Sequence, residues 1–425
     1  MDLSLLSNIE QRVCQRILTL EDELVKVLGD LVAINTADPP ADNYSACADF
    51  LGDYLASIGA RVKIVQVPPE QLPHSSETGE PLSRPNVLGE IAGSGGRPVL
   101  HFNGHYDVVP AAGDWTVNPY KPEVKDGRLY GRGSADMKAG IVAAIAAAKV
   151  LKMEEVTLEG TISFSFAPDE EYGDPAGTRY LVDRKMVPAD YCIIAEPSGG
   201  MDLFNGFKGS LWMEITTYGK PAHGSLPWKG INTFDKMVKV VNEINRKIRP
   251  NLPYQEDVEL DKHTASRTGT MTLGGKVNTG DSTNIVPPQC TMTIDRRLVP
   301  GEDARQVITE FRSILESLKE RDPQFSADLK VLIGYNAGCT PVESPLVQVM
   351  KQSITDTTGQ APDISLTSGG DVRYFHGAGI PTVLYGPGDL AMAHKADEYV
   401  EIAKLVVTTQ VFTLAAMRLL TPVVT

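Results

Sequence analysis

Three short apolar segments of this chain, each expected to form a buried strand, end directly at histidine or acidic side chains. Segment 98–104 is stopped by an Asn-Gly turn, segment 161–167 alternates apolar and small polar residues, and segment 191–195 is almost wholly apolar. Ligands of open α/β sheets bind outside the carboxyl ends of the strands, so these side chains are expected to gather at one edge. The side chains that follow the three strands are His105 and Asp107, then Asp169, Glu170 and Glu171, then Glu196.

Each of these signals has a plain alternative when it is considered alone. A His-x-Asp pair in a loop is often a local turn, although His105 could bind a metal through one nitrogen while Asp107 accepts a hydrogen bond from the other. Three acids in a row are often a solvated turn. Asp136 precedes a helix expected from about 137 to 152, where a carboxylate is favoured as an N-terminal cap. A ligand-binding site is favoured because these histidine and acidic side chains are expected to lie together at one edge of the sheet.

The size and charge of the chain limit its class of partner. At 425 residues it is too long for one ordinary core, so two domains are expected. Its formal net charge of −14 disfavours binding to nucleic acid or to an anionic membrane, which leaves a small-molecule substrate as the expected partner. Five cysteines without a C-x-x-C pair indicate neither a disulfide framework nor a thiolate zinc site. The N-terminus lacks a signal-peptide core, which predicts a cytoplasmic protein.

The order of the expected elements predicts an α/β fold that is interrupted once. Strands and helices alternate up to about residue 205, and from there the pattern changes to strand-helix-strand-strand-helix, an antiparallel α+β arrangement. After about residue 337 the first pattern resumes and ends in a long helix expected at 399–420. The predicted fold class is α/β, with a mixed, mostly parallel sheet flanked by helices. The predicted domains are 1–205 and 337–425 for the α/β part and 206–336 for the smaller insertion.

Seven motifs occur in order along nearly the whole chain, and together they resemble those of the acetylornithine deacetylase, succinyl-diaminopimelate desuccinylase and carboxypeptidase G family. The motifs are Gly-His105-Tyr-Asp107, Gly-Ser-Ala-Asp136-Met-Lys, Asp-Glu170-Glu171-Tyr-Gly, Ala-Glu196-Pro-Ser, Ala-His223-Gly-Ser, Asn284-Ile-Val-Pro and His394-Lys-Ala-Asp-Glu-Tyr. The resemblance implies a catalytic α/β domain that is interrupted by a smaller dimerisation or lid domain, and therefore a homodimer. It also implies two divalent metal ions per chain, with zinc first and cobalt or manganese as substitutes.

The resemblance also implies a role for each matching residue. The implied metal ligands are His105 and Glu196 at one site, Glu171 and His394 at the other, and Asp136 as the bridge between them. Glu170 would be the general base that takes a proton from the metal-bridging water as this attacks the scissile carbonyl, and Asp107 would orient His105. His223 would reach across the dimer to the oxyanion, and Asn284 would add a polar contact. The peptide bond between Asp136 and Met137 is expected to be cis.

A smaller set of positions concerns recognition of the substrate. Substrates of this family usually carry a free carboxylate beside the scissile amide, which calls for a guanidinium group or a cluster of backbone N–H groups. The matching positions in the α/β part are Arg373, Gly386 and Gly388. In the insertion, Arg296 and Arg297 are adjacent; the family pattern favours Arg297, and strand alternation would place the two on opposite faces.

The sequence therefore predicts a metal-dependent amide hydrolase that cleaves the N-acyl group of an N-acyl amino acid. Two alternatives stay open: a dipeptidase or carboxypeptidase that uses the same site, and a non-catalytic dimeric relative that only binds a metal or ligand. Glu170 together with a full ligand set argues against the binding protein, because such a protein needs no base.

Overall fold

The structure of the chain, a computed structural model, describes residues 6–72, 79, 81–173, 176–255, 267–280 and 282–421. By its internal packing the chain divides into two units. The first, called the large unit below, comprises Met1–Gly206, Thr340–Ile364 and Gly370–Thr425, and the second, the inserted unit, comprises Phe207–Cys339 and Ser365–Gly369. The chain ends of the predicted domains, 1–5 and 422–425, lie outside the described residues.

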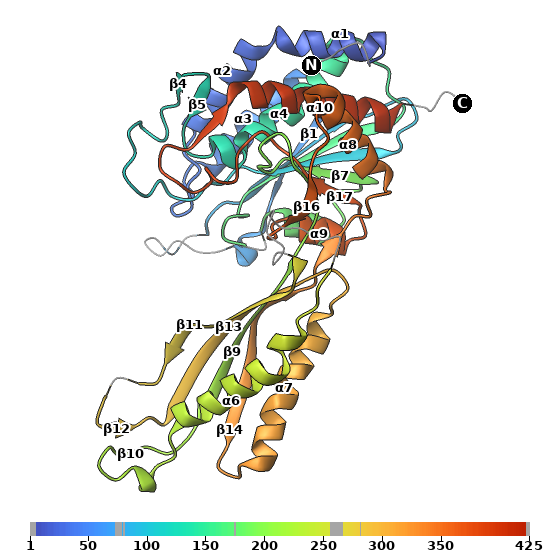
Figure 1. Cartoon of the computed structure of the whole chain (residues 1–425). Helices are drawn as coiled ribbons and strands as arrows, with labels where there is room; N and C mark the ends of the chain where they lie inside the picture. The colour runs from blue at the N-terminus through green and yellow to red at the C-terminus, as the bar shows by residue number, and fades with distance from the viewer. Residues whose placement is uncertain are drawn as a thin grey trace. The chain divides into compact units, whose positions relative to one another are not determined.

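A mixed β-sheet forms the centre of the large unit (Figure 1). Seven of its nine described strands are β1 (Arg61–Gln66), β2 (Pro85–Ile91), β3 (Val99–His105), β6 (Thr161–Ala167), β7 (Tyr191–Ile194), β8 (Leu203–Phe207) and β17 (Thr382–Leu384). They lie in the order β1-β2-β6-β3-β7-β17-β8. The four central strands, β6, β3, β7 and β17, pair in parallel, and the outer strands pair antiparallel. This confirms the predicted fold class, with parallel pairing confined to the middle of the sheet.

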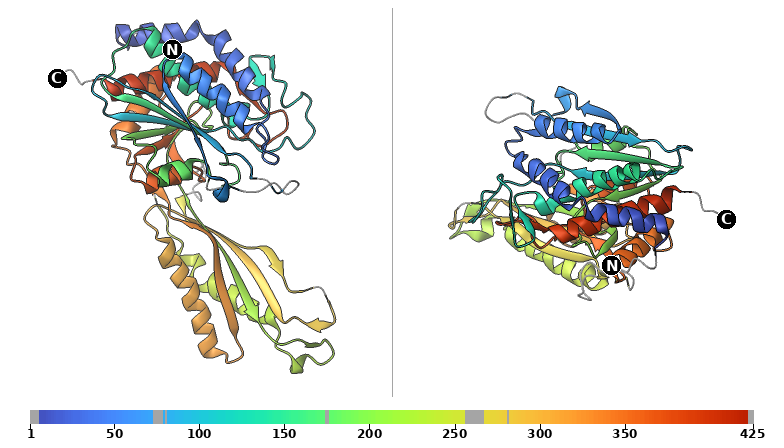
Figure 2. Two further views of the ribbon diagram at one scale, coloured as in Figure 1. Left: turned by 180° about the vertical axis from the view of Figure 1, so that it is seen from behind. Right: turned by 90° about the horizontal axis from the view of Figure 1, so that it is seen from above.

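Helices lie on both faces of this sheet (Figure 2). One face is covered by α3 (Tyr44–Ser57), α4 (Ala139–Met153), α8 (Pro345–Thr358) and α10 (Ile402–Leu420). Two further helices, α1 (Asn8–Leu18) and α2 (Glu21–Ala33), pack outside α4 and α10. The opposite face carries two short helices, α5 (Thr178–Asp183) and α9 (Val372–Gly377). Successive side chains of β3 point to opposite faces of the sheet. Phe102 packs on Phe412 of α10 on one face, and Asn103 donates a hydrogen bond to Thr178 of α5 on the other.

Helix α10 belongs to the core of the large unit. By length and composition it could cross a membrane, but 78% of its most apolar window is buried inside the structure, where it packs against α4 and α8. The prediction that this helix begins at Tyr399 is wrong, because Tyr399–Glu401 form strand β18. This strand pairs with β5 (Arg128–Tyr130), which pairs with β4 (Glu123–Lys125). The ring of Tyr399 stacks beneath the guanidinium of Arg128 at 4.2 Å, a cross-strand contact that favours the strand over a further helical turn.

Within the described residues, the inserted unit is a four-stranded antiparallel sheet with two α-helices. The strands are β9 (Gly209–Tyr218), β11 (Thr270–Asn278), β13 (Gln289–Leu298) and β14 (Ser326–Tyr335), and the helices are α6 (Thr233–Lys247) and α7 (Ala304–Arg321). The strand order is β11-β13-β9-β14, and apolar residues of α6, α7 and the sheet form a separate core. A two-stranded ladder, β10 (Ala222–His223) with β12 (Ile285–Val286), completes the unit. Two short strands, β15 (Gly338–Cys339) and β16 (Ile364–Thr367), lie at the sequence boundaries between the units.

Candidate metal centre

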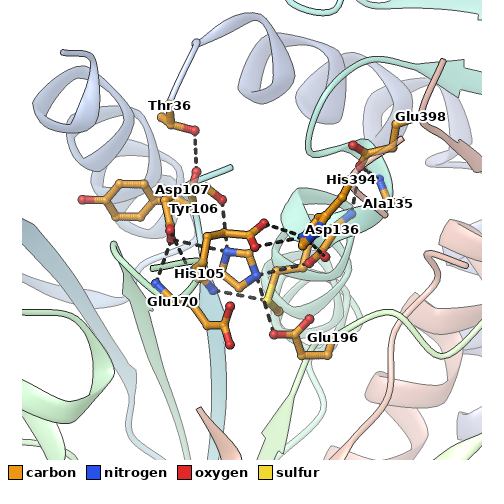
Figure 3. Close-up of polar contacts among 12 residues, drawn as sticks. Thr36, His105, Tyr106, Asp107, Ala135, Asp136, Glu170, Glu196, His394 and Glu398 are labelled. Carbon is orange, nitrogen blue, oxygen red and sulfur yellow. Dashed lines mark hydrogen bonds and ion pairs between the residues drawn. The ribbon is translucent and has the colours of Figure 1, made fainter. Parts of the chain in front are cut away.

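Five side chains that can bind metal ions converge at the carboxyl end of the parallel strands (Figure 3). They are His105 at the end of β3, Asp136 in the turn before α4, Glu171 after β6, Glu196 after β7, and His394 in the loop after β17. The ligand atoms of His105, Asp136 and Glu171 all lie within 4.8 Å of one another, as do those of His105, Glu170 and Glu196.

Asp136 lies between the two imidazoles. Its Oδ1 is 3.2 Å from Nε2 of His105, and its Oδ2 is 3.5 Å from Nε2 of His394. The same nitrogen of His105 lies 3.6 Å from Oε1 of Glu196, and that of His394 lies 2.9 Å from Oε2 of Glu171. The five side chains therefore form two groups, each with one imidazole and one carboxylate of its own, that share the carboxylate of Asp136.

The backbone at Asp136 differs from the N-terminus of a helix. Ser134–Lys138 form a π-type turn in which Asp136 has φ −123° and ψ 99°, and α4 begins only at Ala139. Within the described residues no side chain caps that helix, so the interpretation of Asp136 as a cap is wrong. Its carboxylate contacts the imidazoles instead. The peptide bond between Asp136 and Met137 is cis, which confirms the expectation from the family resemblance.

Asp107 connects the loop of His105 to the acidic turn after β6. Nδ1 of His105 lies 3.0 Å from the backbone oxygen of Asp107 and 3.4 Å from its Oδ1. The Asp107 carboxylate also accepts hydrogen bonds from the backbone N–H groups of Glu170, at 3.3 Å, and Glu171, at 3.1 Å. Because Nδ1 of His105 is held on this side, Nε2 is directed at Asp136.

Glu170 lies beside the ligand groups, and its protonation is strongly affected by burial. Burial raises the pKa of Glu170 to about 8; His105 opposes this shift, and the buried carboxylate of Asp371 adds to it. The start of α9 is close by, since a Cβ at Gly370 would lie 3.2 Å from Oε1 of Glu170. A carboxyl group with a pKa near neutrality is suited to accept and return a proton.

The carboxylates also change the pKa of the imidazoles. At His105 burial alone would lower the pKa, but Glu196 and the other nearby carboxylates outweigh it and raise the pKa well above its usual value. Hydrogen bonds to Asp136 and Glu171 raise the pKa of His394 to about 10. Burial, together with the charge of Asp136, raises the pKa of Glu196 well above its ordinary range. Several negative groups around two imidazoles are a donor set that divalent cations would neutralise, and nitrogen with oxygen ligands suits zinc.

Comparison with known protein families matches residues 101–418 to the family described as peptidase family M20/M25/M40. The chain belongs to this family. A probable succinyl-diaminopimelate desuccinylase of Staphylococcus epidermidis is 29% identical over 402 residues, which cover 89% of this chain and 93% of the relative. Another from Staphylococcus aureus is 26% identical over 417 residues, which cover 93% of this chain and 98% of the relative.

Several solved structures share the fold. An aminopeptidase of Bacillus cereus has a TM-score of 0.74 at 21% identity, covering 94% of this chain and 98% of its own. Human carnosine dipeptidase 1 has a TM-score of 0.70 at 20% identity, covering 97% and 99%. A Bacillus subtilis protein described as a dinuclear metal-binding M20 peptidase has a TM-score of 0.68 at 16% identity, covering 95% and 98%. This M20 chain is thus a hydrolase of amide or peptide bonds, of the metallopeptidase and desuccinylase type.

Sequence reasoning missed two buried ion pairs beside this M20 centre. Arg84, 2% exposed, donates to Asp169 at 2.6 Å and to Asp38 at 2.8 Å, and so fixes Asp169, which has a φ of +69° just before Glu170. Arg84 is 85 positions from Asp169 in the sequence, and no motif connects the two. The second pair joins Arg132 to Glu398. In the sequence Glu398 appears only as part of the His394 motif, and nothing there indicates its partner.

The predicted glycine turn lies behind the ligands. A Cβ at Gly386 would meet the backbone oxygen of Glu196 at 2.5 Å, and one at Gly388 would overlap the backbone of Ala135. The N–H of Gly386 donates to Ser198, so it is engaged within the chain. Close backbone packing against two ligand segments is thus a structural reason for glycine at both positions.

Arg373 lies on α9, next to the acidic turn. Its Nη2 donates to the hydroxyl of Tyr374 at 2.7 Å, and a Cβ at Gly173 would lie 3.8 Å from the same nitrogen. The side chain is only partly buried. The guanidinium therefore lies beside the segment that carries Glu170 and Glu171.

The remaining predicted residues lie in the inserted unit. His223 and Asn284 are neighbours, since Gly224 N–H donates to the backbone oxygen of Asn284, and both side chains are exposed. Nδ1 of His223 is 2.8 Å from Oγ of Ser225, which leaves its Nε2 for other contacts. The two arginines are on opposite faces of β13, as alternation predicts. Arg296 is buried and paired with Glu302, whereas Arg297 is partly exposed and bonds to Asp295 on its own strand.

A cavity of about 790 Å³ lies over the opposite end of β3, and none of the predicted site residues lines it. Its lining includes His101, whose two ring nitrogens are bonded to the hydroxyls of Ser163, at 2.9 Å, and Ser165, at 2.7 Å. Burial lowers the pKa of His101 to about 3, which keeps the ring neutral. With both nitrogens engaged, His101 does not add a metal ligand.

Proposed function

We propose that this M20 hydrolase is a metal-dependent deacylase that removes the N-acyl group of an N-acyl amino acid. The observation that carries the proposal is the pair of ligand groups that share Asp136, with Glu170 next to them. The desuccinylase relatives favour a deacylase. The peptidases among the structures of the same fold keep a dipeptidase or carboxypeptidase as the second candidate.

Two divalent ions, zinc first and cobalt or manganese as substitutes, would be held by the five converging side chains. His105 and Glu196 would complete one site, Glu171 and His394 the other, and Asp136 would serve both through its two oxygens, each of which faces a different imidazole. When bound, such ions polarise the scissile carbonyl and make water a better nucleophile near neutral pH.

The chain itself would supply the proton transfers and the orientation. Glu170 would accept a proton from the attacking water and deliver it to the nitrogen of the leaving amine, a role that its half-buried position beside the ligands supports. Asp107 would hold the His105 ring and the backbone of Glu170 and Glu171 in place. With Glu170 present, a protein that only binds a metal or ligand is disfavoured.

The substrate would carry a carboxylate. Arg373 supports this, because a guanidinium beside the acidic turn can bind a carboxylate through two hydrogen bonds. Of the two adjacent arginines, Arg297 is the candidate for a substrate contact, since Arg296 is buried and paired. Gly386 and Gly388 would contribute the shape of the turn; the N–H of Gly386 is engaged with Ser198.

The chain would act as a homodimer in the cytoplasm, with residues 1–205 and 337–425 as the catalytic domain and 206–336 as the lid. Strand β14 supports association through the lid, because it is an edge strand of ten residues with Leu332 45% exposed and Ile333 41% exposed. In such a dimer His223 would contact the oxyanion at the active site of the second subunit, and Asn284 would add a polar contact beside it.

The test is hydrolysis of a panel of N-acetyl, N-succinyl and N-formyl amino acids and of dipeptides, with protein loaded with zinc or cobalt. The proposal expects turnover of at least one acyl amino acid, and the loss of that turnover when a chelator removes the metal. Turnover of dipeptides alone would replace the deacylase by the second candidate. Turnover that is unchanged in metal-free protein would overturn the metal assignment.

A further inference from the structure

We infer that Glu398 is a positioning residue that holds the segment of Asp136 and the segment of His394 together. The inference rests on the proposed function, because it concerns the two ligand segments assigned above. Glu398 is 0% exposed and does not belong to the ligand set. It follows His394 by four residues, and its side chain reaches the turn that carries Asp136 (Figure 3).

The carboxylate of Glu398 holds the backbone of the Asp136 turn directly. Oε1 accepts hydrogen bonds from the N–H groups of Ala135, at 2.8 Å, and Asp136, at 3.1 Å. Oε2 accepts a hydrogen bond from the guanidinium of Arg132, which lies four residues before Asp136 in the sequence. One carboxylate thus satisfies three donors along the turn, including the backbone N–H of the ligand that both groups share.

The backbone of Glu398 belongs to the segment of His394, and two adjacent residues, Asp397 and Glu398, attach that segment to the rest of the large unit. The backbone oxygen of Glu398 accepts from the N–H of Gly131 at 2.9 Å. The preceding residue, Asp397, accepts from the N–H of Thr116 at 2.8 Å and from its hydroxyl at 2.9 Å. A displacement of Glu398 would therefore move His394 and Asp136 relative to each other. Their imidazole and carboxylate must stay close to bind one ion together.

Stability alone is a weak explanation for this ion pair. Both side chains are 1% exposed, and burying two charges costs desolvation free energy that their attraction often only offsets. Within the described part of the chain, Nε and Nη2 of Arg132 have no hydrogen-bond partner, although the guanidinium lies over the ring of Trp115 at 5.2 Å. The pair is more readily explained by the geometry that it gives to the ligand segments.

The inserted unit offers a matched control. Glu302 is also a largely buried carboxylate that accepts from an arginine, Arg296, and from a backbone N–H, that of Val299 at 2.8 Å. It lies outside the large unit and in neither ligand segment. Glu398→Gln and Glu302→Gln therefore remove the same type of charge, one beside the proposed metal centre and one elsewhere.

The experiment is a titration of metal-free protein with Co²⁺, followed by its visible absorption spectrum, with thermal unfolding of the same samples. Glu398→Gln should weaken Co²⁺ binding by roughly 10- to 100-fold and change the spectrum, as removal of a group that orients a ligand commonly does. Glu302→Gln should lower the unfolding temperature without weakening Co²⁺ binding. Arg132→Lys keeps a positive donor for Glu398, so its affinity should lie between those of the wild type and Glu398→Gln.

The outcomes separate this inference from the proposed function. If the wild type binds no Co²⁺, the proposed metal centre itself is wrong. If the wild type binds two ions and Glu398→Gln binds them as tightly with the same spectrum, Glu398 is not a positioning residue. Equal losses of affinity in Glu398→Gln and Glu302→Gln would also overturn the inference, because the effect would then be general. Should Glu398→Gln fail to fold, Arg132→Lys decides alone, and wild-type affinity in that variant overturns the inference.

Discussion

The candidate residues of the two units differ in their surroundings. In the large unit His105 is 2% exposed and Asp107 is 0% exposed, and both are fixed by hydrogen bonds within the chain. In the inserted unit His223 and Asn284 lie on an exposed two-stranded ladder. Low exposure strengthens electrostatic interactions and prevents competition from water, so the first group can form a reactive centre by itself. The exposed pair would need another surface to act, which agrees with the proposal, taken from the family resemblance, that it acts in a second subunit.

The largest expected effect tests the large unit. Glu170→Gln keeps the size of the side chain and removes the proton acceptor, so turnover of the best substrate should fall by roughly 10² to 10⁴. Metal content, measured by elemental analysis, should stay at the wild-type value, because this substitution leaves the five proposed ligands in place. Unchanged turnover would show that Glu170 is not the base; a loss of metal along with turnover would make it a ligand instead.

The second effect tests the exposed pair. His223→Ala should lower kcat by about 10² to 10³, the usual cost of losing one oxyanion donor, while metal content and thermal unfolding stay at wild-type values. Another exposed position on the same unit, Phe234→Ala, is the control and should keep turnover.

Mixing variants sharpens the comparison of the two units. If His223 acts in the second subunit, mixed dimers of Glu170→Gln with His223→Ala contain one site with both residues, and mixing should restore part of the activity. Restoration requires that subunits exchange, which can be followed with one tagged variant. Mixed dimers that form but stay inactive would place His223 at the active site of its own chain.

The third effect compares the two imidazoles. The side chain of His394 is 53% exposed, in a loop with a φ of +64°, whereas that of His105 is 2% exposed at a strand end. Elemental analysis of His394→Ala should therefore show the loss of about one of the two ions. The free energy of unfolding of the metal-free variant should stay within about 0.5 kcal/mol of the wild-type value, as is usual for exposed substitutions. His105→Ala should lose metal and also destabilise the metal-free protein. Equal destabilisation by both would contradict this contrast.

The difference between the units also explains what the sequence could predict. Strands β3, β6 and β7 are buried on both faces, so their apolar runs and the polar residues after them could be read from the sequence, and with them His105, Glu170, Glu171 and Glu196. Strand β14 was not predicted, because it lies at an edge and its residues are only half-buried or exposed.

Contacts between distant segments were beyond the sequence. Arg84 and Asp169 are joined only by the fold, and no local pattern indicates such a pair. Local propensity alone would have made Asp136 a helix cap, because the residues that follow it are strong helix formers; only the tertiary contacts with His105 and His394 show the other conformation. The family resemblance supplied that shared position, which local propensity did not.

The smallest effect concerns the inserted unit alone. Asp322, at the end of α7, accepts hydrogen bonds from Lys236 and Lys239 of α6, each at 2.7 Å, and these bonds lower the pKa of Asp322 below its ordinary value. A carboxyl group whose pKa is lowered by folding stabilises the folded state above its unfolded pKa, near 3.9, and loses this contribution as the pH falls further. Asp322→Asn should therefore cost about 1 kcal/mol at pH 7, because one of its two partners, Lys239, is 49% exposed and water screens that ion pair.

The pH dependence decides whether this small loss is electrostatic. In denaturant titrations the difference between wild type and Asp322→Asn should be constant from pH 7 to about pH 5 and shrink towards pH 3, since Asp322 of the unfolded chain then takes up a proton while the folded carboxylate is still ionised. Asp183→Asn, which breaks an exposed ion pair with Arg179 on the large unit, is the control and should change stability less. Removal of the Asp322 contacts should leave Co²⁺ binding by the large unit unchanged. A difference that persists undiminished at pH 3 would mean that the packing of Asp322, and not its charge, joins α6 to α7.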